Sequence, residues 1–407
     1  ERMNVTGSRG LLRLGLLLLL LPLRGAHGLV WPQPKRVHHA RDRPLLYVTP
    51  ATAFVVESDR AGSVLRGAVE RYNSLLRRQA TANAPPPAQR LRQIVVGVAS
   101  HDDKLSAATS YAYTVRIQSA KNATIMANTC YGAAHALESV VQLFETTTTQ
   151  SGGIFPVEIE DYPSFPWRGV MLDVGRRFAP VSMIENLLDT MAAVKLSVLH
   201  LHASDYCRFA IESKRYPQLG LALQPGKPDA GVYSQTEIRQ LIRYAKLRGI
   251  RIVPEFDLPG HAYRWASTLQ ETGTGLTLCH GTDYTIHHND STNASYHVLH
   301  SLLEEMASLF EDEVMHVGMD EVVDPAPCST IGTLKLEQML VDAVENDFGK
   351  TVMGWNPIAV VVRNQKHHNV IVNSYMANAA AAFVKEGFSV VDSESSHWYF
   401  THPAGWD

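Results

Sequence analysis

From residue 165 to the end of the chain, apolar runs typical of buried strands alternate with amphipathic segments, and this rhythm constrains the fold most. The amphipathic segments at 183–194, 235–247 and 298–310 have helical periodicity. The predicted strands are residues 169–174, 197–201, 251–256, 314–317, 351–354, 369–373 and 389–391. These seven β/α units are one short of the eight that close a TIM barrel. The sequence therefore predicts an α/β fold, with a TIM (β/α)8-type barrel over residues 161–407 that lacks its last strand unit at the C-terminal end.

A smaller domain is predicted ahead of the barrel. Residues 45–160 mix short strands with two amphipathic helices at 64–78 and 133–143, which predicts a small α+β domain without catalytic residues. The predicted strands of this domain are residues 46–48, 94–99, 113–117 and 124–127. The basic stretch at 29–44 is expected to be an extended linker.

The first 28 residues have the pattern of a signal peptide. Arg9 and Arg13 precede a leucine run at 16–21, and a small-x-small sequence ends at Gly28. The leucine run is too short for a stable membrane span. The sequence therefore predicts entry into the secretory pathway, with a lysosomal or extracellular destination. In the secretory pathway, Asn-x-Ser/Thr sequons are candidate glycosylation sites. The sequons of this chain begin at Asn122, Asn289 and Asn293.

Charge and composition exclude some partners. The 407 residues carry a formal net charge of −3, with 19% charged and 45% hydrophobic residues. A nucleic-acid-binding chain would present a strongly basic surface, so no nucleic-acid partner is predicted.

Polar and aromatic side chains recur where the predicted barrel strands end, which is where β/α barrels place their chemistry. The most informative are Asp320 and Glu321, two adjacent carboxylates after a buried run. Other residues at strand ends are Asp173, Arg176, His200, His202, Asp205, Glu255, Asp257, His261, Trp355, Tyr375, Trp398 and Tyr399. Aromatic rings that stack on sugar rings, together with carboxylates that bind hydroxyls, favour a neutral carbohydrate substrate.

The chain resembles family 20 glycoside hydrolases, the β-N-acetylhexosaminidases. Residues 316–321, His-Val-Gly-Met-Asp-Glu, are similar to the family's His-x-Gly-Gly-Asp-Glu signature. Residues 167–169, 200–205 and 255–261 resemble its Arg-Gly, His-Trp-His-x-x-Asp and Glu-Phe-Asp-x-Pro-Gly-His elements. The resemblance implies hydrolysis of terminal N-acetylglucosamine or N-acetylgalactosamine from glycans, without a cofactor or metal. The resemblance also allows a homodimer, because related enzymes often dimerise.

The resemblance also implies a role for individual residues. Most retaining glycosidases place two carboxylates on opposite sides of the scissile bond, which neighbouring residues cannot do. Family 20 instead uses the substrate's own acetamido group, with Glu321 as acid and base and Asp320 orienting the amide. The substrate-binding residues implied are Arg168, Asp205, His261, Trp355 and Tyr399. A disulfide between Cys279 and Cys328 is expected, because both follow barrel strands at one face and the family bridges this pair.

Departures from the family pattern leave two alternatives. Met319 replaces a glycine, Leu201 replaces a tryptophan, and Thr401 stands where many members have an aspartate. These changes and the missing last strand would suit an inactive secreted carbohydrate-binding protein on a degenerate barrel. A metal-dependent amidohydrolase is the other alternative, because His200 and His202 are spaced to share a metal.

Overall fold

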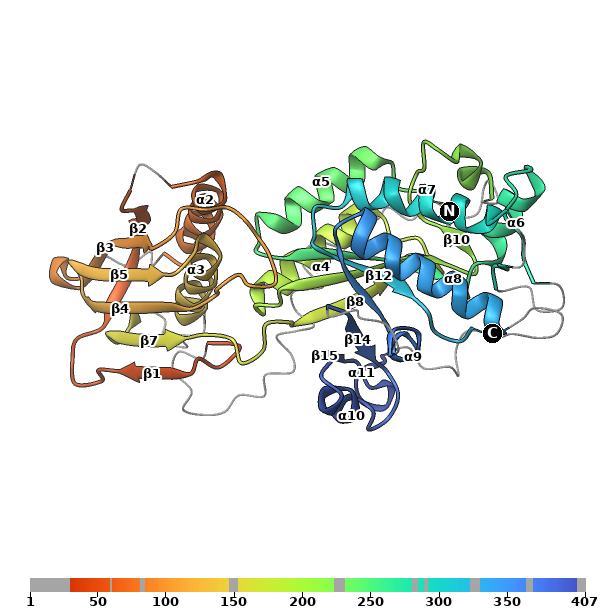
Figure 1. Ribbon diagram of the computed structural model, residues 1–407. Coiled ribbons are helices and arrows are strands. Elements are labelled where there is room, and N and C mark those ends of the chain that lie inside the picture. The colour runs from red at the N-terminus through yellow and green to blue at the C-terminus, as the bar shows by residue number, and fades with distance from the viewer. Residues whose placement is uncertain are drawn as a thin grey trace, which may run out of the picture.

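The computed structural model describes residues 30–58, 61–80, 85–145, 153–222, 231–279, 285–288, 292–322, 330–363 and 369–400. These residues form two bodies that meet along one side, an α+β domain and a β/α barrel (Figure 1). The predicted signal peptide lies outside the described residues. In the described part of the chain, no helix has both the length and the apolar character needed to cross a membrane.

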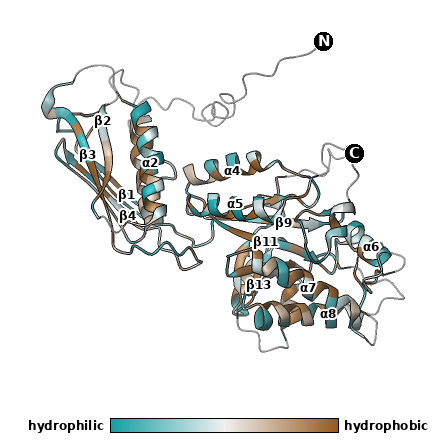
Figure 2. Cartoon of the chain, turned by 90° about the horizontal axis from the view of Figure 1, so that it is seen from above, coloured by the Kyte–Doolittle hydropathy of each residue, from teal (hydrophilic) through white to brown (hydrophobic). Residues whose placement is uncertain are grey.

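The N-terminal domain is a seven-stranded mixed sheet with two helices on one face (Figure 2). Helix α2 (Ser63–Arg78) buries an apolar stripe against β2, and α3 (Cys130–Glu145) packs beside it. The sheet order is β1-β7-β4-β5-β3-β2-β6. The strands are β1 (Arg36–His39), β2 (Leu46–Val56), β3 (Arg90–Val98), β4 (Tyr113–Ser119), β5 (Asn122–Ala127), β6 (Gly153–Ile154) and β7 (Val157–Asp161), and a short 3-10 turn, η1 (Pro87–Gln89), precedes β3.

The segment expected to be a linker contributes a strand to this sheet. Residues 36–39 form β1, which pairs antiparallel with β7 at the edge of the sheet. The stretch is extended and largely exposed, as its composition indicates, but its backbone is hydrogen-bonded to the domain. The expectation of an independent linker at 29–44 is therefore wrong for these four residues.

The second body is a curled sheet of parallel strands surrounded by helices, as expected for a TIM-type barrel. Its parallel strands, in spatial order, are β8 (Gly169–Asp173), β9 (Val198–Asp205), β11 (Arg251–Leu258), β12 (Val314–Gly318), β13 (Thr351–Trp355), β14 (Ile371–Ser374) and β15 (Ser389–Asp392). A short antiparallel strand, β10 (Arg208–Phe209), pairs with the end of β9. Within the described residues the sheet has seven parallel strands, and β8 and β15 are its two edges, which confirms the predicted fold class.

The helices cover the outer face of this sheet, and their apolar residues form one continuous core with the strands. Both β9 and β11 are buried at every residue, as parallel strands covered on both faces should be. The helical elements are α4 (Val181–Ala193), η2 (Pro217–Ala222), α5 (Gln235–Lys246), α6 (Tyr263–Glu271), α7 (Ala294–Leu309), α8 (Thr330–Asp342), η3 (Ala343–Asp347), α9 (Ile358–Val362), α10 (Ala380–Lys385) and α11 (Ser395–Trp398). The buried strands therefore provide a rigid platform for side chains at their ends.

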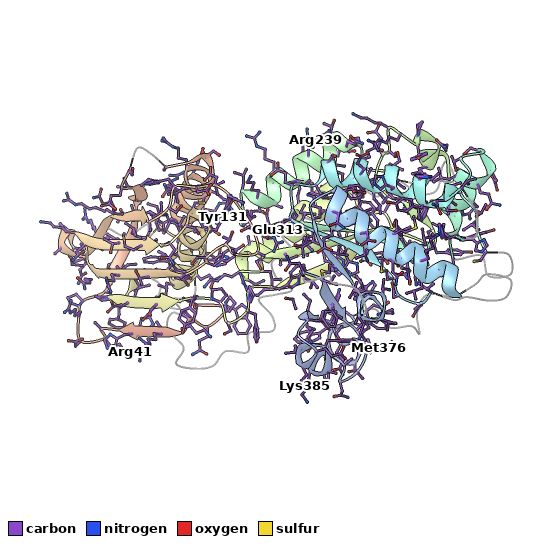
Figure 3. All side chains as sticks on the ribbon, viewed as in Figure 1. Arg41, Tyr131, Arg239, Glu313, Met376 and Lys385 are labelled. Carbon is purple, nitrogen blue, oxygen red and sulfur yellow. The ribbon has the colours of Figure 1, made fainter. Side chains whose placement is uncertain are left out.

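The N-terminal domain contacts the amino ends of the barrel strands. Lys195, which follows α4, donates to the Tyr113 hydroxyl at 2.9 Å and lies 3.3 Å from the Asp161 carboxylate. The Ala107 amide donates to Glu313 at 2.6 Å, and Figure 3 shows Glu313 on the barrel side of this junction. These contacts occupy the end of the barrel opposite to the predicted site.

Candidate active site

Asp320 and Glu321 lie directly after β12, at the carboxyl end of the barrel strands. The chain turns sharply there, because Gly318, Met319 and Glu321 all have positive φ angles, of 72°, 73° and 48°. A Cβ on Gly318 would overlap the Asp257 carboxylate, so both the angle and the space require glycine. The turn places the two carboxylates on the rim of the sheet, where the Asp320 side chain is 19% exposed and that of Glu321 is 67% exposed.

Met319 stands where the resembled family has a second glycine. Its side chain is fully buried in the core between the sheet and the helices, so it points away from the rim carboxylates. A positive φ at a residue with a side chain costs about 1–2 kcal/mol, which the burial of the methionine offsets. The substitution therefore does not crowd the site.

His261 connects the carboxylate pair to Asp205. Its Nε2 atom lies 3.4 Å from Glu321 and 3.9 Å from Asp320, and its Nδ1 atom lies 3.5 Å from Asp205. Asp205 is at the end of β9, which continues four residues beyond the end of the predicted strand, and its side chain is fully buried. Although burial by itself lowers the pKa of His261, the Asp205 carboxylate raises it above its usual value.

Arg176 is the arginine of this site. It follows β8 and places its guanidinium 2.9 Å from Asp205 and 2.9 Å from Asp173. Burial opposes the charge, but these two carboxylates raise the pKa of Arg176. Nearly half of its side chain remains exposed at the rim, so it can bind a hydroxyl group.

The prediction that Arg168 lines the site is wrong. Arg168 precedes β8, so it lies at the amino end of the strand, beside the N-terminal domain. Its guanidinium donates to the backbone carbonyl of Lys195 at 3.0 Å and to that of Phe165 at 2.8 Å, and it stacks over Tyr111. Strand polarity in the sequence could have distinguished it from Arg176, because only the latter follows its strand.

Glu255 is the centre of a buried group of donors beneath the rim. Its carboxylate lies 2.7 Å from His200, 2.8 Å from His202 and 3.4 Å from His316, and it accepts a 2.8 Å hydrogen bond from the Trp355 indole. Burial alone would raise the pKa of Glu255, but the imidazoles hold it well below its usual value. The carboxylate thus accounts for the His-x-His spacing by close charge contacts with both imidazoles, and its hydrogen bond with the indole fixes Trp355 at the end of β13.

Asp257 and Asp320 are acids whose environment opposes ionisation. Burial raises the pKa of Asp257 well above its usual value, and the neighbouring Asp320 and Glu255 charges raise it further. Burial and the Glu255 charge also raise the pKa of Asp320, to about 6, while a hydrogen bond from Asp257 lowers it. Both acids are therefore harder to ionise than free carboxyl groups, and Asp257 is the more deeply buried of the two.

The aromatic residues lie at the open side of the rim. Trp355 is partly exposed and packs edge-on against Tyr375 at 5.7 Å. Burial, Asp320 and Glu321 all raise the pKa of Tyr375. Tyr399 is 59% exposed, and it is one of the groups that raise the pKa of Arg176. Within the described residues, one cavity of about 370 Å³ lies at the domain junction, away from these side chains.

The remaining predicted residues fall partly outside the described chain. Cys279 is disulfide-bonded, but Cys328 lies outside the described residues, so their pairing stays a prediction. Cys130 and Cys207 are free cysteines. Asn122 is exposed and Asn293 is partly buried at the start of α7. Asn289 and Thr401 are outside the described residues.

Sequence reasoning gave no site role to several residues that the structure places here: Asp173, Arg176, His202, Glu255, Asp257 and Tyr375. The signal for them was their position after or near the end of a predicted strand. Their mutual contacts depend on strand register, which the sequence pattern does not specify.

Comparisons with known proteins show which family the chain is similar to. The catalytic domain of glycosyl hydrolase family 20 matches residues 165–407, and a "beta-acetyl hexosaminidase like" domain matches residues 30–143. Beta-hexosaminidase subunit A2 of Dictyostelium discoideum is 31% identical over 271 residues, which cover 66% of this chain and 49% of that protein. Beta-hexosaminidase 1 of Arabidopsis thaliana is 26% identical over 415 residues, which cover 92% of this chain and 73% of that protein. The chain thus spans about half to three quarters of the length of these relatives.

Solved structures show the same fold. The chitobiase of Flavobacterium johnsoniae superposes with a TM-score of 0.74 at 25% identity, covering 90% of this chain and 59% of that one. A mutant beta-hexosaminidase of Streptomyces plicatus superposes with a TM-score of 0.70 at 22% identity, covering 95% of this chain and 83% of that one. With its family match over more than half of its length, the chain belongs to glycosyl hydrolase family 20.

Proposed function

We propose that the protein is a β-N-acetylhexosaminidase, a retaining exo-glycosidase that releases terminal N-acetylglucosamine or N-acetylgalactosamine from glycans. The observation that carries the proposal is the adjacent pair Asp320 and Glu321 on the rim, both facing His261. Two neighbouring carboxylates act from one side of a glycosidic bond, so the nucleophile has to come from the substrate.

In the proposed reaction, the carbonyl oxygen of the 2-acetamido group attacks the anomeric carbon of its own sugar. Glu321 gives a proton to the departing glycosidic oxygen, then takes one from the water that opens the bicyclic intermediate. Asp320 accepts a hydrogen bond from the acetamido N–H and stabilises the positive charge that develops on the ring.

The other rim residues would hold the sugar. Arg176 has an exposed guanidinium edge for a ring hydroxyl, and we assign it the substrate contact that the sequence led us to expect of Arg168. Trp355 offers a fixed aromatic face for the apolar side of the sugar ring. Tyr399 is proposed to reach the acetamido group, and its exposure leaves it free to move toward a ligand.

We also infer that the protein passes through the secretory pathway to a lysosomal or extracellular location. The disulfide at Cys279 supports this, because structural disulfides persist in oxidising compartments. The exposed sequon at Asn122 is suited to glycosylation, whereas Ser295 of the Asn293 sequon is buried and bonded to Thr277. Cleavage by an N-glycosidase, followed by mass spectrometry of each site, tests both sequons.

The function is tested with two chromogenic substrates that have the same aryl leaving group. The full-length protein should hydrolyse the aryl β-N-acetylglucosaminide at least about 100-fold faster than the aryl β-glucoside, because only the first supplies an internal nucleophile. Equal rates would exclude the assisted mechanism. A Glu321→Gln variant should keep its affinity for N-acetylglucosamine but lose turnover, whereas a sugar-binding protein without activity would show no turnover in either form.

A further inference from the structure

His202 lies between two buried carboxylates. Its Nδ1 atom is 2.8 Å from a Glu255 oxygen, and its Nε2 atom is 2.8 Å from an Asp205 oxygen. All three side chains are at most 4% exposed, so water does not mediate or replace these contacts. His202 is on β9, three residues before the strand ends at Asp205.

The two contacts determine the protonation state of the ring. An ionised carboxylate only accepts hydrogen bonds, and a neutral imidazole has a single N–H. Nε2 is hydrogen-bonded to Asp205, whereas Nδ1 lies 2.8 Å from Glu255 without the alignment of a hydrogen bond. A bare ring nitrogen this close to an ionised carboxylate oxygen would set two lone pairs against each other, so the two contacts favour a proton on each nitrogen, which means an imidazolium ion. Burial alone would lower the pKa of His202, but Glu255 and Asp205 together raise it well above its usual value.

The surrounding charges are consistent with a fixed positive charge at this position. Burial by itself raises the pKa of Asp205, whereas His202, His261 and Arg176 hold it below its usual value. The other titratable groups around His202 and its two partners are Asp173, Asp257, His200 and His316. His316 accepts the Gly318 amide on Nδ1, and burial lowers its pKa to about 3, so it stays neutral.

Asp205 connects His202 to the residues on the rim. Its second oxygen faces Nδ1 of His261 at 3.5 Å, and Nε2 of His261 faces Glu321 at 3.4 Å. The orientation of Asp205 thus sets the orientation of the imidazole that contacts the acid. The resulting chain of groups runs from Glu255 through His202, Asp205 and His261 to Glu321.

We propose that His202 is a positioning residue, a permanently charged imidazolium that holds Asp205 so that His261 can orient Glu321. The inference rests on the proposed function of Glu321 as the acid. His202 does not reach the rim and transfers no proton in the cycle. Its charge keeps two buried carboxylates ionised next to each other, which would otherwise repel and take up protons.

His200 provides a matched control. It is two residues earlier on the same strand, equally buried, and 2.7 Å from the same Glu255 carboxylate. Its ring lies 6.0 Å from the Trp355 ring, centroid to centroid, so it belongs to the Trp355 side of the cluster rather than to the chain that leads to Glu321. His200→Gln and His202→Gln therefore make the same chemical change on two sides of one carboxylate.

The charge state of His202 is tested by ¹⁵N nuclear magnetic resonance of histidine-labelled full-length protein. We expect one imidazole to keep both ring nitrogens protonated from pH 5 to pH 8, with signals that disappear in His202→Gln and persist in His200→Gln. A His202 ring that titrates within this range, or that holds a single proton, overturns the proposal. A bound metal that is released by a chelator also overturns it, since a metal needs a bare ring nitrogen.

The positioning role is tested by leaving-group dependence. A poor leaving group needs the proton from the acid, whereas a dinitrophenyl group leaves almost without it. We expect His202→Gln to lower kcat/KM, which reports only the step in which the leaving group departs, about 10–100-fold on an alkyl N-acetylglucosaminide and less than about threefold on the dinitrophenyl substrate. His200→Gln should lower both rates by one common factor. Equal losses on both substrates in His202→Gln would refute the proposal, while hydrolysis by the wild-type protein separately tests the proposed function.

Discussion

Both ends of the barrel sheet bury charged groups, but they arrange them differently. At the amino end, each cation meets a fixed partner: Lys195 lies against Asp161 and Tyr113, and Arg168 bonds to backbone carbonyls. At the carboxyl end, acids crowd together, and burial raises the pKa of both Asp257 and Asp320. The first arrangement joins two domains. The second shifts the pKa values of the carboxyl groups toward the working pH, as catalysis requires.

The difference shows that the role of a polar residue depends on which end of a strand it lies at. Arg168 and Arg176 flank the same strand, β8, and both are partly buried, yet one supports the domain junction and the other faces the rim. Substitutions at the amino end should therefore change stability, whereas those at the carboxyl end should change turnover. Four predictions test this separation.

Replacement of Asp320 by asparagine should have the largest effect. We expect kcat to fall about 10³-fold, because the positive charge on the acetamido group loses its counter-charge. Stability should instead rise by about 1–3 kcal/mol at pH 7, since the pKa of this buried carboxyl is raised to about 6 in the folded protein. The gain should disappear as the pH falls from 6 to below 4, where both states are protonated. A loss of stability at pH 7 would contradict this account.

Breaking the buried pair at the domain junction should have the next largest effect. Asp161→Asn leaves Lys195 buried without a counter-charge, which should lower the free energy of unfolding by about 3–5 kcal/mol. Turnover per folded molecule should not change. Glu160→Gln, on the same strand, breaks an exposed pair with Arg36 and should cost less than about 1 kcal/mol. Chemical denaturation and active-site titration distinguish the two quantities.

Replacing the two arginines that flank β8 should have opposite effects: one replacement should lower kcat/KM, and the other should lower the free energy of unfolding. Arg176→Met should lower kcat/KM about 10–100-fold, the usual loss when a charged hydrogen bond to a ligand is removed. Arg168→Met should leave kcat/KM within about threefold of the wild-type value and lower the free energy of unfolding by about 2 kcal/mol. The reverse pattern would restore Arg168 as the substrate-binding residue.

The smallest effect concerns pH. His135 stacks on Tyr111 at the domain junction, and burial together with the Lys195 and Arg168 charges lowers its pKa well below the usual value. The unfolded chain therefore takes up a proton below pH 6.5 that the folded protein excludes, so stability falls as the medium becomes acidic. His135→Phe should reduce this loss by about 1–2 kcal/mol between pH 7 and pH 5. An unchanged pH profile of the melting temperature would show that His135 is not the titrating group.

The sequence predicts the fold better than it predicts the site. Strand and helix periodicity located the barrel strands, because parallel strands covered on both faces are apolar throughout. It also located Asp320 and Glu321, which follow a strand directly. It did not locate the contacts of His202 or Glu255, since these depend on how β9 and β11 align. The edge strand β1 was missed because a short, exposed strand has no apolar alternation.

The most direct test of the central claim is the affinity for a stable bicyclic analogue of the ion that forms when the acetamido oxygen closes on the anomeric carbon. Calorimetry should show that the wild-type protein binds this analogue at least about 100-fold more tightly than N-acetylglucosamine. Asp320→Asn should lose most of that advantage, because Asp320 faces the developing charge. Equal affinity of the wild-type protein for the analogue and the free sugar would contradict the proposed mechanism.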